Sequence, residues 1–131
     1  MLVNMIAKFF RNEEQSEDLS TPINAEAQFV LTYKDLVVGT LTRGHGKWAF
    51  EYSEAFKRQN KISVLTDFPH KDKKYEESYL WPFFAHRIPG LGQPQVKEII
   101  KEEHIDSKNE IDLLRRFGQK TITNPFELAS S

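Results

Sequence analysis

The chain has 131 residues, of which 39% are hydrophobic, 28% charged and 12% aromatic, and its formal net charge is -1. This length allows one domain with a core but not two independent cores. The near-balance of charge argues against a dedicated nucleic-acid binder, which usually carries a strong basic excess. The absence of cysteine excludes disulfides, thiolate nucleophiles and cysteine-ligated metal sites.

The first 25 residues are predicted to form an extension rather than part of the core. Apolar residues recur at helical spacing in residues 1–10, which predicts a short amphipathic helix. Residues 11–24 are acidic and polar, and they are typical of a linker. The opening stretch lacks a basic region and a small-residue cleavage site, and it is too short to span a bilayer. We therefore expect a cytoplasmic protein without a membrane partner.

The folded domain is predicted to cover residues 26–131 and to begin with three strands. Residues 27–33, 36–43 and 47–53 are β-prone and are separated by the short turns Lys34-Asp35 and "GHG". Together they predict an antiparallel meander. The last strand alternates, with Trp48, Phe50 and Tyr52 on one side. This stripe of rings is interpreted as a core face; the alternative is an exposed platform on which single-stranded nucleic acid stacks.

The segment after the meander has weaker patterns. Residues 53–59 predict one or two helical turns, and the β-prone run 62–66 predicts a fourth strand. Residues 67–78 are highly charged and contain Pro69, so a surface loop is expected there.

The C-terminal part is predicted to be mainly helical. Pro94 opens a helix over residues 94–105, and a second helix is expected over 107–118. Ser107 and Glu110 have the spacing of a capping box, and Gly118 stands at the expected C-cap. The tail 121–131 is expected to add an edge strand. The predicted fold class is therefore α+β, with a small antiparallel sheet followed by helices.

No pattern of catalytic or metal-binding residues is found. The histidines at positions 45, 70, 86 and 104 have no partner at metal-ligand spacing. The stretch "PGLGQP" (89–94) lacks the third glycine of a dinucleotide-binding loop, and no serine lies in a nucleophile elbow. We expect a protein that is not an enzyme and that has no cofactor and no metal.

The stretch "YLWPFFAHRIPGLG" (79–92) contains most of the information about binding. Four aromatic residues in fourteen positions must be buried either in the core of this chain or against a partner. At least one phenylalanine is expected in the core, while Trp and Tyr are the types most enriched in interface hot spots. The candidate partner-binding residues are Tyr79, Trp81, Pro82, Phe83, Phe84, His86 and Arg87.

Several motifs in order resemble the N-terminal subdomain of HipA-type toxin kinases. The resemblance covers residues 27–118 and is carried by "VVGTLTR" (37–43), "GKWAFEY" (46–52), "ISVL" (62–65), "WPFFAHRIPG" (81–90) and "DLLRRFG" (112–118). His86 and Arg87 depart from the family pattern, which has Asn and Leu there, and Gly90-Leu91 replaces Glu-Gly.

The resemblance implies a free-standing version of that subdomain, similar to the HipS component of HipBST toxin–antitoxin systems. Such a protein would be an antitoxin that binds and neutralises a separate HipT-like Ser/Thr kinase beside a HipB-like DNA-binding protein. It would not bind nucleic acid directly. The alternatives are an accessory subunit of the same complex without inhibitory activity and a small module that binds single-stranded nucleic acid.

Overall fold

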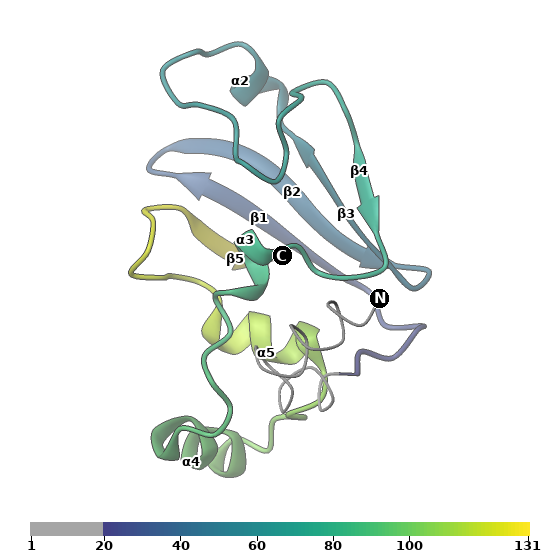
Figure 1. Ribbon diagram of the computed structural model, residues 1–131, viewed down its shortest axis with the longest axis vertical. Helices are drawn as coiled ribbons and strands as arrows, with labels where there is room; N and C mark the ends of the chain where they lie inside the picture. The colour runs from purple at the N-terminus through teal and green to yellow at the C-terminus, as the bar shows by residue number, and fades with distance from the viewer. Residues whose placement is uncertain (1–19) are drawn as a thin grey trace, which may run out of the picture.

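The computed structural model describes residues 20–131, which form a five-stranded antiparallel sheet with helices and loops packed against one face (Figure 1). The predicted helix at residues 1–10 lies outside the described residues. The strand order is β4-β3-β2-β1-β5. The strands are β1 (Ala27–Tyr33), β2 (Leu36–Gly44), β3 (Lys47–Tyr52), β4 (Tyr75–Glu77) and β5 (Glu127–Ser130). The helices are α2 (Glu54–Lys57), α3 (Pro82–Ala85), α4 (Pro94–Glu102) and α5 (Glu110–Phe117).

The predicted meander is confirmed, as is the predicted edge strand at the C-terminus. β1 pairs with β2 and β2 with β3, both antiparallel. His45 and Gly46 both have positive φ (53° and 76°) in the β2–β3 turn, which is the geometry that matches the twist of a tight hairpin. β5 pairs antiparallel with β1 and thereby extends the sheet at that edge.

The predicted fourth strand at residues 62–66 is wrong, and β4 lies instead in the segment expected to be a surface loop. In residues 62–66, side chains form hydrogen bonds with backbone groups that would pair with a neighbouring chain in a strand. The side-chain amide of Gln59 accepts hydrogen bonds from the N–H groups of Lys61 and Ile62 and donates one to the Ile62 carbonyl. The Leu65 N–H donates to the Tyr52 hydroxyl. The run is therefore anchored as a loop, while Tyr75 pairs opposite Phe50.

The aromatic stripe of β3 forms the centre of the core. Trp48 and Phe50 are 0% exposed and Tyr52 is 2% exposed. The Phe50 ring lies 4.3 Å from that of Phe68 and 5.7 Å from that of Phe84, centroid to centroid. The core interpretation of this stripe is confirmed, so these rings are not available as a stacking platform for nucleic acid.

A bulge in β2 connects the sheet to α2. Leu31 is opposite Gly39, and the next residue, Thr32, is opposite Val37, so Val38 is the extra residue. The Val38 carbonyl accepts a hydrogen bond from the Ser53 N–H at 2.9 Å, and the Ser53 hydroxyl accepts one from the Phe56 N–H as the N-cap of α2. Gly39 is required here because an added Cβ would lie 2.6 Å from both the Glu51 carbonyl oxygen and the Phe50 ring.

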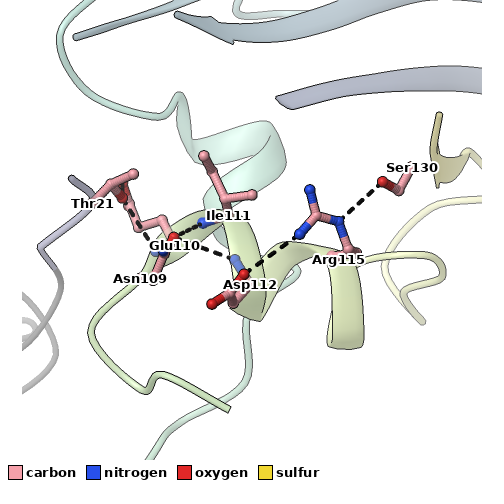
Figure 2. A network of polar contacts seen from close by, with 7 residues as sticks. All are labelled: Thr21, Asn109, Glu110, Ile111, Asp112, Arg115 and Ser130. Atoms are coloured by element: carbon pink, nitrogen blue, oxygen red, sulfur yellow. Dashed lines mark hydrogen bonds and ion pairs between the residues drawn. The ribbon is translucent and has the colours of Figure 1, made fainter. Parts of the chain in front are cut away.

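The N-cap of helix α5 lies two residues later than predicted. The N-cap is Asn109, whose side-chain oxygen accepts hydrogen bonds from the N–H groups of Ile111 and Asp112, so the predicted Ser107–Glu110 capping box is wrong (Figure 2). Asparagine is among the strongest N-cap residues, which explains why it is used here. Gly118 is the C-cap as expected, but with φ -90°. Glycine is needed there because a Cβ would lie 2.6 Å from the Leu114 carbonyl oxygen.

The buried Tyr52 hydroxyl links three segments of the core. It donates a 2.6 Å hydrogen bond to the Phe68 carbonyl and accepts a 2.8 Å bond from the Leu65 N–H. Burial raises the pKa of Tyr52 to about 12. Since the unfolded pKa is about 10, this contribution to stability is fully present below pH 10 and is lost as the pH rises through 12.

We expect the Tyr52→Phe variant to lose less stability than the wild type when the pH is raised above 10. The variant lacks both hydrogen bonds, so at pH 7 it should be less stable than the wild type by about 1–2 kcal/mol. Between pH 10 and 12 the wild type should lose up to about 2–3 kcal/mol more than the variant, because only the wild type has a buried hydroxyl to ionise. Urea unfolding at a series of pH values measures this difference. Parallel pH profiles for the two proteins would contradict it.

Candidate functional site

The ring-rich segment forms the short helix α3 and its flanks, on the helical side of the sheet (Figure 1). Trp81 is the N-cap and Pro82 occupies the first turn, where a proline loses no hydrogen bond. The Phe83 N–H donates a 3.0 Å hydrogen bond to the Asp67 carboxylate, which satisfies one of the free donors at the helix start. These contacts fix where α3 begins.

Three of the seven candidate residues lie in the core of this chain. Trp81 is 6% exposed, and its ring meets that of Phe68 edge-on with 4.9 Å between centroids. Phe84 is fully buried between Phe50 and Phe83. Arg87 is only 4% exposed. In this structure these side chains stabilise the fold and do not lie on the surface.

The other four candidates lie on the surface, and we call them the 79–86 surface: Tyr79, Pro82, Phe83 and His86. Tyr79 is 55% exposed, Pro82 and His86 are exposed, and Phe83 is half-buried. Pro82 and His86 are four residues apart across the single turn of α3, so they share one side of it. Binding of a partner by the seven residues stays a prediction.

Arg87 has a structural environment that its sequence position does not reveal. Its guanidinium donates from Nη1 to the carbonyls of Gly118 (3.0 Å) and Gln119 (3.4 Å). From Nη2 it donates to the Asn124 side-chain oxygen (3.1 Å) and the Phe126 carbonyl (2.9 Å). All four acceptors are neutral and all belong to the connection between α5 and β5.

The buried environment of Arg87 disfavours the charged form of its side chain. Burial lowers the pKa of the guanidinium to about 10. The Phe83 ring lies 5.5 Å from the guanidinium carbon, which provides a favourable cation–π contact. A buried cation without a carboxylate is retained only where its hydrogen bonds are well formed. Arg87 therefore acts as a clamp on the chain that precedes β5.

A second polar cluster lies on the inner face of the sheet, at the start of α5. Burial raises the pKa of the Glu110 carboxyl, which accepts a 3.4 Å hydrogen bond from the Thr21 hydroxyl (Figure 2). The Thr21 hydroxyl in turn accepts from the Glu110 N–H at 3.2 Å. Nearby, the buried Arg43 guanidinium carbon lies 5.4 Å from the Trp48 ring centroid. This cluster joins residue 21 and the β2–β3 hairpin to α5, and the contacts among its members did not emerge from the sequence patterns.

Residues 20–131 contain no group of three or more His, Cys, Asp or Glu side chains placed to hold a metal ion. Over the same residues, no helix has the length and apolar character needed to cross a membrane. This part of the chain does offer a buried aromatic core, the exposed side chains of the 79–86 surface, and the buried Arg87, which contacts the Phe83 ring of that surface.

Comparisons with known proteins identify the fold. None of the curated proteins matches the sequence. Among solved structures, the N-terminal domain of HipA toxin matches with a TM-score of 0.51 and 15% sequence identity, over 80% of this chain and 92% of that one. The family model described as the HipA N-terminal domain matches residues 30–123, which is most of the chain. The α+β fold and the family resemblance are thus confirmed, and the chain belongs to the HipA N-terminal domain family.

Proposed function

We propose that this chain is a non-enzymatic antitoxin that binds and neutralises a separate HipT-like Ser/Thr kinase, in a complex that also contains a HipB-like DNA-binding protein. The observation that carries the proposal is the family match over residues 30–123, because the matched subdomain is not the catalytic part of HipA. A domain of this kind acts by binding, so its function depends on its exposed side chains.

The 79–86 surface supports the proposal. Among residues 20–131, Tyr79 is the large aromatic side chain with the greatest exposure, and tyrosine is frequent in interface hot spots. Half-buried Phe83 and exposed His86 lie in the same short segment. Since Trp81 lies in the core, we assign to Tyr79 the role of the ring that enters a cleft of the kinase or pins its small lobe.

Co-expression with the HipT-like kinase encoded beside it tests the proposal. Growth rescue together with a complex that survives purification is the expected result. A stable complex without rescue would make the chain an accessory subunit and would assign neutralisation to the DNA-binding protein. The absence of any complex would reject the proposed partner.

Tyr79→Ala is expected to weaken the complex without changing the fold. Removing an exposed hot-spot ring should raise the dissociation constant by about 10-fold or more. The free energy of unfolding should stay within about 0.5 kcal/mol of the wild-type value, as is usual for an exposed position. Titration of the purified kinase measures the affinity. Val37→Ala, at an exposed apolar position of β2, is the matched control and should bind like the wild type. Equal affinity of Tyr79→Ala and Val37→Ala would remove Tyr79 from the interface.

A further inference from the structure

Residues 119–125, within the connection between α5 and β5, present an apolar side chain at the surface. We call these residues the 119–125 loop; it is the loop at the left of Figure 1, coloured towards yellow. Ile122 is fully exposed, more than any other large hydrophobic residue in the described part of the chain. A single exposed apolar residue is common on protein surfaces and by itself indicates nothing. The informative feature is how firmly the structure holds the loop.

The base of the 119–125 loop is closed by the Arg87 clamp and by a main-chain hydrogen bond. Arg87 Nη1 binds the carbonyls of Gly118 and Gln119 at the start of the loop, and Nη2 binds the Asn124 side chain and the Phe126 carbonyl at its end. The Leu128 N–H also donates to the Gln119 carbonyl at 2.8 Å. One buried cation therefore fixes both ends of a loop whose apex is in solvent.

The interior of the loop is ordered by its own side chains. The hydroxyls of Thr121 and Thr123, on either side of Ile122, are hydrogen-bonded to each other at 3.1 Å. The Asn124 side-chain oxygen accepts a 3.1 Å bond from the Phe126 N–H. A loop that is already held in one conformation loses less conformational entropy when it binds, and this raises its affinity for a complementary surface.

The loop also adjoins the 79–86 surface. The rings of Phe83 and Phe126 meet edge-on with 5.8 Å between centroids, so the residue directly after the loop packs against α3. Polar residues flank Ile122 along the chain, namely Lys120, Thr121, Thr123 and Asn124. An apolar centre with a polar rim is the composition of a protein-binding surface.

We propose that the 119–125 loop is a preorganised recognition loop whose Ile122 side chain inserts into an apolar pocket of the kinase partner. This inference rests on the proposed function. The pocket would accept an aliphatic side chain, and its rim would carry hydrogen-bond acceptors or acidic groups for the threonine hydroxyls and Lys120. Arg87 and Asn124 are positioning residues that hold the loop in its binding conformation.

The experiment is a titration of the HipT-like kinase with the full chain and with Ile122→Asp. We expect the variant to bind about 10-fold more weakly or worse, because an aspartate cannot be desolvated in an apolar pocket. Ile23→Asp is the matched control: Ile23 is also exposed and lies in the segment before β1, across the molecule from the loop in Figure 1. Ile23→Asp should bind like the wild type. Unfolding curves show that each variant is folded.

Wild-type affinity of Ile122→Asp would overturn the inference and leave the proposed function standing. Failure of the wild type itself to bind the kinase would reject both. An equal loss in Ile122→Asp and Ile23→Asp would also overturn the inference, since it would show a general effect of added negative charge.

The positioning role is tested by a double-mutant cycle between Asn124→Ala and Ile122→Ala. If Asn124 acts through Ile122, the effect of Ile122→Ala on affinity should shrink at least about two-fold when Asn124 is already alanine. A merely structural role of Asn124 would lower the unfolding midpoint but leave the effect of Ile122→Ala unchanged, and this result would overturn the positioning assignment.

Discussion

Replacing Arg87 by alanine is expected to lower the free energy of unfolding by about 3 kcal/mol. The guanidinium donates four hydrogen bonds within 3.4 Å, and its removal takes this donor away from the Gly118 and Phe126 carbonyls of the α5–β5 connection. Hydrogen bonds to a charged group contribute about 1.5–3 kcal/mol each, and unsatisfied buried acceptors reduce stability further. Some of this loss is offset because the variant no longer buries a cation. Urea denaturation of the two proteins measures the difference.

Two control variants separate the effect of the Arg87 hydrogen bonds from the effect of removing a positive charge. Arg87→Lys keeps a cation but lacks the planar fork that reaches acceptors on both sides of the loop, so it should recover less than half of the lost stability. Arg116 forms an exposed ion pair with Glu103 at 2.7 Å, and Arg116→Ala should change stability by less than about 1 kcal/mol. A similar unfolding midpoint for Arg87→Ala and Arg116→Ala would contradict the clamp.

The three-stranded meander was predictable because its signal is local. Inward-facing residues recur with period two along β1 and β3, and a glycine-containing turn separates β2 from β3. At residues 62–66 the local pattern gave a wrong prediction. β-branched residues favour a strand there, but the side chains of Gln59 and Tyr52 form hydrogen bonds with the N–H groups of Ile62 and Leu65. Those contacts depend on tertiary position, which composition does not reveal.

The candidate site was predictable as a segment but not residue by residue. Many rings in residues 79–92 had to be buried somewhere, and the structure buries Trp81 and Phe84 while exposing Tyr79. The choice depends on Phe68, which packs on Trp81 from a segment whose charge suggested a surface loop. The role of Arg87 was hidden for a similar reason, because its acceptors lie 31 to 39 residues further along the chain. No local pattern predicts such contacts.

Phe68 is the residue for which the sequence pattern and the structure disagree most. The charged stretch around it predicted a surface loop, yet its side chain is completely buried. Its ring contacts those of Phe50, Tyr75, Trp81 and Phe84, with centroid distances between 4.3 and 6.0 Å. Phe68 thus joins β3, β4 and α3, and its carbonyl also accepts the Tyr52 hydrogen bond.

Phe68→Ala is therefore expected to be the most destabilising single substitution discussed, with a loss of about 4 kcal/mol. Truncation of a fully buried phenylalanine removes its transfer free energy and leaves a cavity, and such changes typically destabilise by about 3–5 kcal/mol. Phe68→Leu fills most of that volume and should lose about half as much. Urea unfolding measures both values, and near-ultraviolet circular dichroism reports the packing of Trp81 against the altered site. If Phe68→Ala were as stable as the wild type, residues 67–78 would be the surface loop that their charge suggests, and the position of Trp81 in the core would lose its main support.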